Sequence, residues 1–210
     1  IRDSSRNCLR AQAWDMPNAA HTLTGECDWA TLAPSARFAV ARGGPSDSHP
    51  LYLVVLDSAN RREPLAPEGV RQPRISPDGR WLAYASGQTQ AREVFAMRIR
   101  GPRGAMQVSS GGGTEPVWSP DGRELFYRAN GKLIAAKLIT HPDLSVVRHD
   151  TLFDDVYWTR PNNNLSDDYD VAPDGSHFIF IRASVAKTNP VLVIGWLAEL
   201  EKRGLLKRSR

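Results

Sequence analysis

A sequence repeat with a step of 43 residues is the feature that most limits how this chain can fold. The run Ser-Pro-Asp-Gly-Arg at 76–80 returns at 119–123, and the related run Ala-Pro-Asp-Gly-Ser stands at 172–176. A decayed copy, Ala-Pro-Ser-Ala-Arg, lies one further step upstream at 33–37. Recurrence of this kind predicts an array of similar small structural units.

Each unit is predicted to contain four short antiparallel strands. The apolar rhythm repeats together with the turns, because a shift of 43 moves the apolar run 51–56 onto 94–99. In the turn, Pro presets φ, Asp bonds its own backbone and Gly adopts positive φ, which together favour a tight hairpin. In the best-preserved unit we expect strands at 72–75, 81–85, 93–99 and 106–109.

The residues of these turns are interpreted as structural. An Asp that recurs at the same turn in every unit is better explained by hydrogen bonds to its own backbone than by metal binding or catalysis. The structural turn residues are Pro77, Asp78, Gly79, Pro120, Asp121, Gly122, Pro173, Asp174 and Gly175.

Four antiparallel strands in every unit of about 40 residues predict an all-β fold, a β-propeller with about four and a half blades. We expect one propeller domain or fragment over 1–202. Its predicted parts are a partial blade 1–27, full blades 28–70, 71–113 and 114–166, and a partial blade 167–202, followed by a basic tail 203–210. Propellers usually close so that no strand edge is exposed. We therefore expect a part of a six-bladed or larger ring, with a closed five-bladed ring as the alternative.

Composition agrees with a packed globular domain. The 210 residues are 41% hydrophobic and 24% charged, which is unlike a disordered chain. The net charge of +4 comes largely from the tail, and no apolar run reaches the ~18 residues of a membrane span. A helical pattern occurs only at 195–202. Cys8 and Cys27 either form one bridge or act as small half-buried residues.

The best-preserved repeat, 115–127, reads Glu-Pro-Val-Trp-Ser-Pro-Asp-Gly-Arg-Glu-Leu-Phe-Tyr and resembles the TolB-like family of six-bladed propellers. With the stretches 111–114, 169–175 and 191–200, it also resembles the C-terminal propeller of some bacterial eukaryotic-like serine/threonine kinases. The resemblance covers 70–202 well and the first 69 residues loosely. The chain departs from the family pattern at Ala33, Ser35, Ala36 and Gly195.

The resemblance implies a sensing or protein-binding part, with any catalysis elsewhere in a longer protein. The sequence contains no Gly-rich nucleotide loop and no Asp-Phe-Gly, and its Arg-His-Asp at 148–150 lacks the downstream Asn of a kinase catalytic loop. The Gly-x-Ser-x-Gly elbow of hydrolases is absent as well. We therefore expect no enzyme activity and no cofactor in this chain.

Two further groups of residues are given structural roles. Trp81, Phe95, Trp118 and Tyr127 lie on predicted strands and are expected to pack between blades. An acidic cluster could coordinate calcium through carboxylate oxygens, but it lacks the spacing of a calcium loop, so a solvated approach to a strand is the favoured interpretation. This cluster consists of Asp167, Asp168, Asp170 and Asp174. The scattered histidines give no zinc motif, and no metal is expected.

The candidate binding site lies where the repeat is interrupted. From Pro120 to Pro173 is 53 positions, ten more than the step, and the excess is expected within 147–168. Long loops on a rigid scaffold often carry recognition, and this one holds residue types that anchor interfaces. The candidate ligand-binding residues are Tyr157, Trp158, Arg160, Asn162 and Asn163. The alternative is a tolerated surface insertion that covers a blade edge.

The sequence thus favours a non-catalytic propeller that binds a protein, peptide or cell-envelope ligand, as the sensory or interaction region of a bacterial receptor-like serine/threonine kinase. The alternatives are a substrate-gating propeller of a prolyl-peptidase-like hydrolase and a TolB-like periplasmic scaffold. We expect an extracytoplasmic location in a bacterium. No nucleic-acid partner is expected, because basic and aromatic residues are not interleaved.

Overall fold

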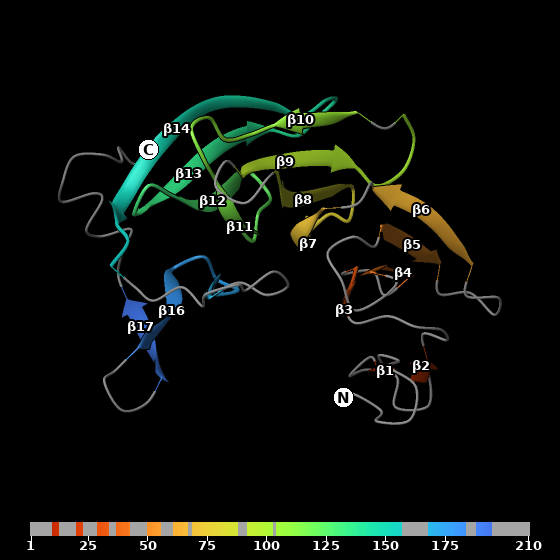
Figure 1. Ribbon diagram of the computed structural model, residues 1–210, viewed down its shortest axis with the longest axis horizontal. Helices are drawn as coiled ribbons and strands as arrows, with labels where there is room; N and C mark the ends of the chain where they lie inside the picture. The colour runs from red at the N-terminus through yellow and green to blue at the C-terminus, as the bar shows by residue number, and fades with distance from the viewer. Residues whose placement is uncertain are drawn as a thin grey trace.

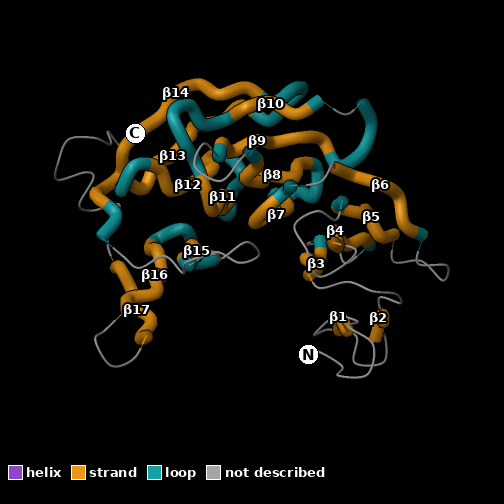
Figure 2. Tube along the Cα trace, viewed as in Figure 1, coloured by secondary structure: helices purple, strands orange, loops and turns teal. Residues whose placement is uncertain are grey.

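The computed structural model describes residues 10–12, 20–22, 29–33, 37–42, 50–55, 61–66, 69–87, 92–102, 104–156, 168–183 and 188–194. Within these ranges all regular secondary structure is β-strand (Figure 2). The expected helix at 195–202, both cysteines and the basic tail 203–210 lie outside the described residues. In the part of the chain that is described, no helix is long and apolar enough to cross a membrane.

The strands form five antiparallel sheets that follow chain order. The first contains β1 (Arg10–Gln12) and β2 (Ala20–Thr22). The second contains β3 (Trp29–Leu32), β4 (Phe38–Arg42), β5 (Leu51–Val55) and β6 (Arg62–Ala66). The third contains β7 (Arg71–Ile75), β8 (Trp81–Ser86), β9 (Glu93–Arg98) and β10 (Ala105–Gln107). The fourth contains β11 (Thr114–Trp118), β12 (Glu124–Ala129), β13 (Lys132–Ile139) and β14 (Ser145–Asp154), and the last contains β15 (Tyr169–Val171), β16 (His177–Ala183) and β17 (Thr188–Ile194).

The sheets follow one another along an arc, with β1–β2 and β15–β17 at its two ends (Figure 1). The first strands of neighbouring sheets lie next to each other, as β7 does to β11 and β11 to β15. The indole Nε1 of Trp118 donates to the carbonyl oxygen of Arg74 over 3.1 Å, which joins two such first strands. This confirms the predicted all-β propeller class, in which each sheet is a blade and its first strand lies nearest the axis.

The Ser-Pro-Asp-Gly hairpin turns at 76–79 and 119–122 form where the sequence predicted them. Asp78 accepts a hydrogen bond from the backbone N–H of Arg80 over 3.0 Å, and Asp121 accepts one from Arg123 over 3.0 Å. Gly79 and Gly122 have φ of 71° and 70°, which only glycine adopts without strain. The strands predicted for 71–113 are observed with ends shifted by one or two residues.

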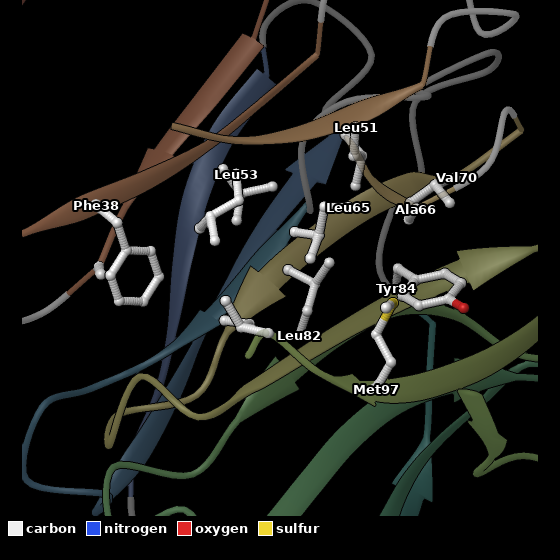
Figure 3. Close-up of a cluster of buried hydrophobic side chains, with 12 residues drawn as sticks. Phe38, Leu51, Leu53, Leu65, Ala66, Val70, Leu82, Tyr84 and Met97 are labelled. Atoms are coloured by element: carbon white, nitrogen blue, oxygen red, sulfur yellow. The ribbon is translucent and has the colours of Figure 1, made fainter. Parts of the chain in front are cut away.

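The core consists of separate apolar layers between neighbouring blades. Along β8, Leu82 and Tyr84 face the β3–β6 sheet (Figure 3), whereas Trp81 and Ala83 face the β11–β14 sheet. Successive side chains of a strand point to opposite faces, so burial of both faces requires an unbroken apolar run. The predicted packing roles hold, since Trp81, Trp118 and Tyr127 are buried and Phe95 packs against the first layer.

The fourth sheet departs from the repeat in two places. Asn130 and Gly131 form a two-residue hairpin with positive φ at both positions (49° and 69°), which shortens the β12–β13 connection. β14 then continues for ten residues to Asp154. Much of the expected insertion within 147–168 is therefore strand, and the chain departs from the repeat mainly after Asp154.

Candidate functional site

One buried polar residue occupies the same repeat position at the start of three successive blades. Gln72 lies 43 positions before Glu115, and Asp168 follows at the corresponding place after the longer unit. Gln72 and Glu115 have φ of 49° and 54°, a left-handed conformation that costs a non-glycine residue about 1–3 kcal/mol. The register of each first strand shifts at this point. A strained buried polar residue therefore recurs at the start of the blade.

These residues join each blade to the next. The Gln72 side-chain oxygen accepts a hydrogen bond from the backbone N–H of Glu115 over 3.0 Å. In the next blade, a carboxylate oxygen of Glu115 accepts one from the backbone N–H of Asp168 over 2.8 Å. At Glu115 the left-handed backbone carries one of these N–H groups, so its local strain is offset in part by a buried hydrogen bond. We call the contact of Gln72 with Glu115, and that of Glu115 with Asp168, the two joints between blades.

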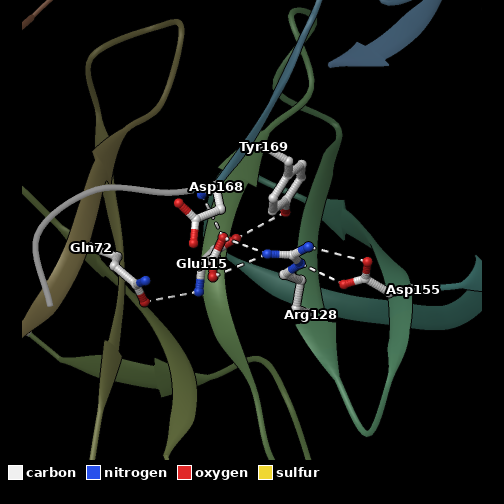
Figure 4. A network of polar contacts seen from close by, with 6 residues as sticks. All are labelled: Gln72, Glu115, Arg128, Asp155, Asp168 and Tyr169. Atoms are coloured by element: carbon white, nitrogen blue, oxygen red, sulfur yellow. Dashed lines mark hydrogen bonds and ion pairs between the residues drawn. The ribbon is translucent and has the colours of Figure 1, made fainter. Parts of the chain in front are cut away.

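Arg128 adds a charged network to the second joint (Figure 4). Its Nη1 lies 3.2 Å from Oε2 of Glu115, its Nη2 donates to Oδ1 of Asp155 over 3.1 Å, and its Nε donates to Oδ2 of the same carboxylate. All three side chains are 5% exposed. The guanidinium also lies 5.7 Å from the ring centres of Tyr169 and Phe180, in cation–π geometry.

Burial and charge oppose each other in this network. Burial raises the pKa of Glu115, while Arg128 and the N–H of Asp168 act to lower it; the net shift is upward. Burial would lower the pKa of Arg128, but the bonds to Asp155 and the charge of Glu115 raise it overall. A buried guanidinium that contacts two carboxylates favours one geometry, because losing the arginine leaves two buried carboxylates without its positive charge.

The network fixes both ends of the connection that follows β14. Asp155 stands directly after β14, and Asp168 stands directly before β15. The hydroxyl of Tyr169 donates to the backbone carbonyl of Glu115 over 2.9 Å, which adds a further bond at the second end. The chain thus leaves the fourth blade and enters the last one at points set by Glu115 and Arg128.

The candidate ligand-binding residues predicted from sequence lie between these anchored ends. Tyr157, Trp158, Arg160, Asn162 and Asn163 are outside the described residues, so their assignment stays a prediction. Val156, the last described residue before them, is 83% exposed. The structure therefore supplies the base of the predicted loop.

Sequence reasoning missed Glu115, Arg128 and Asp155. A signal was present, because the 43-residue step aligns Arg128 with Ala85 and Glu115 with Gln72. An arginine directly after the strand residues Leu-Phe-Tyr at 125–127, where the neighbouring blade has alanine, requires a buried partner.

Within the acidic cluster near β15, Asp168 is not solvated as the sequence favoured, whereas Asp170 and Asp174 are exposed. Asp168 is fully buried, because its N–H bonds Glu115 and its side chain lies inside the blade interface. Asp170 is exposed and lies 3.9 Å from Arg74 of β7. Asp174 accepts from the N–H of Ser176 in its turn, and this bond lowers the pKa of Asp174. Asp167 is outside the described residues, and among those described no three acidic, His or Cys side chains could hold a metal ion.

Comparison with known proteins supports the fold. No protein-family model and no protein of curated function matches the sequence. Among solved structures, TolB from Acinetobacter baumannii superposes with a TM-score of 0.61 at 16% identity, over 89% of this chain and 45% of that one. A candidate TolB from Agrobacterium tumefaciens gives a TM-score of 0.55 at 16% identity, over 79% and 57%. The tricorn protease gives 0.50 at 13% identity, over 84% of this chain and 23% of that one.

These similarities define the class of the molecule. The chain has the β-propeller fold of TolB-like proteins, and it spans about half the length of the two TolB structures that it matches. At these identities the likeness concerns the fold alone, so activity, ligand and location are argued from the chain itself.

Proposed function

We propose that this chain is a non-catalytic propeller that binds a protein, peptide or cell-envelope ligand through the connection between Asp155 and Asp168. The observation that carries the proposal is the buried Glu115–Arg128–Asp155 network, which holds both ends of that connection against two packed blades. A receptor whose loop ends are already fixed loses less free energy to ordering when it binds. The Tyr, Trp, Arg and Asn side chains within the connection are types that anchor interfaces.

For the whole protein we propose an extracytoplasmic sensory region of a bacterial receptor-like serine/threonine kinase. The motif resemblance over 70–202 supports this proposal, and the TolB-like fold is compatible with it. The alternatives are a gating propeller of a hydrolase and a periplasmic scaffold. The reading frame upstream of Ile1 separates them: a kinase domain with a membrane helix favours the first, a Gly-x-Ser-x-Gly domain the second, and a leader without a kinase the third.

Ligand binding is tested with the 210-residue chain immobilised against a solubilised cell-envelope extract of the organism that encodes it. The test variant carries Tyr157→Ala, Trp158→Ala and Arg160→Ala. A matched control carries Arg37→Ala, Arg123→Ala and Ile139→Ala, three exposed positions at the opposite ends of the strands. We expect the test variant to lose proteins that the wild type and the control both retain, and an unchanged set of retained proteins would remove this connection as the binding site.

A further inference from the structure

The outermost strand of the fourth sheet, β14, is an unusually long sheet edge. It has ten residues, whereas the corresponding strands β6 and β10 have five and three. β14 pairs with β13 on one side, and on its other side no strand of the described residues pairs with it. It runs along the outside of the described part of the molecule (Figure 1). A long free edge presents unpaired backbone N–H and C=O groups to any incoming strand.

Two charged side chains of β14, Arg148 and Asp150, have no opposite charge directly across from them on β13. Lys137 of β13 lies directly opposite Arg148 of β14, and like charges in this position destabilise a sheet. Lys137 lies 3.6 Å from Glu124 on its inner side, and Arg148 bends along its own strand to Asp150, with Nε 3.0 Å from Oδ2. Asp150 itself lies opposite Ala135. The edge therefore favours a carboxylate beyond Arg148 and a cation beyond Asp150.

We propose that β14 pairs antiparallel with β14 of a second copy of this chain, about a two-fold axis at His149. In an antiparallel pair centred on His149, each Arg148 lies opposite the other copy's Asp150, so the two charges are complementary. Both side chains are accessible for this, at 53% and 37% exposure. One surface serves both copies, which gives a closed two-fold dimer.

The neighbouring residues fit the same register. His149 would meet its own copy at the axis, and its Nε2 is directed away, to the carbonyl oxygen of Val108, 2.8 Å distant. Val147, which is 58% exposed, would lie opposite Thr151 and be partly covered. Pairing with β13 is regular from Arg148 to Thr151, between the two bulges of β14, so the central segment presents an undistorted edge.

Charge reversal tests this register directly. In Arg148→Asp or in Asp150→Arg, both symmetric contacts become like-charge pairs, and we expect the dimer dissociation constant to rise about tenfold or more. In an equimolar mixture of the two variants every carboxylate faces a guanidinium, so a mixed dimer should form. The double variant with both changes should dimerise with itself for the same reason.

Molar mass is measured by analytical ultracentrifugation of the 210-residue chain over a range of concentrations, with circular dichroism as a check of folding. Arg123→Asp and Glu63→Arg change the net charge equally at exposed sites away from β14, and they should leave the dimer unchanged. A wild type that stays monomeric up to ~1 mM overturns the proposal. So does a dimer that persists unchanged in both single variants, or a mixture of folded variants that fails to associate.

Discussion

The two blade interfaces on either side of the β11–β14 sheet solve the same packing problem differently. On the side of β7–β10, the joint pairs Gln72 with the backbone of Glu115, and Ala85 lies fully buried nearby in sequence register. On the side of β15–β17, the equivalent positions hold Glu115 and Arg128. One joint is neutral and the other is charged, although the first strands and their strained backbone are alike.

The neutral and the charged joint differ in the length of the connection that crosses each interface. The connection from β10 to β11 is short. Within it, the Glu93 carboxylate accepts hydrogen bonds from the backbone N–H groups of Gly111 and Gly112 over 3.0 and 2.9 Å. It packs so closely that a Cβ on Gly113 would lie 2.6 Å from the Ser109 hydroxyl. The connection after β14 is too long for such local closure. Its two ends are held instead by the buried Arg128, which contacts Asp155 directly and Asp168 through Glu115. Burying this charge costs free energy.

The largest effect is expected where the charged joint loses Arg128, which contacts the carboxylates of both Glu115 and Asp155. Arg128→Ala leaves the carboxylates of Glu115 and Asp155 buried and should lower the free energy of unfolding by about 3–5 kcal/mol. Urea denaturation measures this. Lys132→Ala, which removes an exposed ion pair with Asp154, is the matched control and should cost no more than about 1 kcal/mol. Equal losses in the two variants would show that the buried network does not stabilise the interface.

The second prediction makes the charged joint resemble the neutral one. A variant with Arg128→Ala, Glu115→Gln and Asp155→Asn removes the arginine and both carboxylates that it contacts, and it leaves Asp168 unchanged. It should be more stable than Arg128→Ala alone by about 2 kcal/mol, because neutral groups are less costly to bury than carboxylates that have lost their arginine. The same urea series measures the difference. If the triple variant is the less stable of the two, the carboxylates are not what makes the arginine necessary.

The contrast between these joints also explains what the sequence could predict. Turns such as 76–80 are local, since Pro, Asp and Gly act on their own backbone, and a fixed step repeats them through the chain. Blade class and strand positions follow from that. The burial of both faces of β8, with Leu82 on one face and Trp81 on the other, also follows from the alternation of side chains along a strand.

The charged network depends on contacts across blades, and a single sequence does not specify them. Glu115 meets Asp168 across 53 positions, and Arg128 meets Asp155 only because β13 and β14 form a long hairpin between them. Asp168 was interpreted as solvated, because an acidic run before a strand is usually exposed. The aligned change from Ala85 to Arg128 was the only signal of a charged joint in the repeat.

The third prediction compares two tryptophans within one apolar layer. Trp118 donates its indole N–H to the carbonyl of Arg74, whereas the buried Nε1 of Trp81 has no hydrogen-bond partner. Trp118→Phe therefore loses a hydrogen bond between blades, and Trp81→Phe removes a buried donor that is unsatisfied. We expect the first change to cost about 1 kcal/mol more than the second in thermal or urea unfolding. Equal costs would mean that the Trp118 bond adds nothing beyond packing.

The smallest effect is a pH dependence that distinguishes the two joints. Burial raises the pKa of Glu115 above the ordinary glutamate value of about 4.3, so the folded state holds this proton more tightly than the unfolded state does. Its contribution to stability is then complete at low pH and is lost as pH rises through the folded pKa. Glu115→Gln lacks this dependence, as the Gln72 joint does.

The free energy of unfolding of the wild type minus that of Glu115→Gln should therefore fall as pH rises above the ordinary glutamate pKa of about 4.3, with a slope below about 1.4 kcal/mol per pH unit. Urea unfolding at half-unit pH intervals measures it, and Glu63→Gln at an exposed site serves as the control. A difference that grows toward pH 7 would mean that Arg128 outweighs burial at Glu115. The charged joint would then be the stronger of the two, and the long connection would be held by a net electrostatic gain.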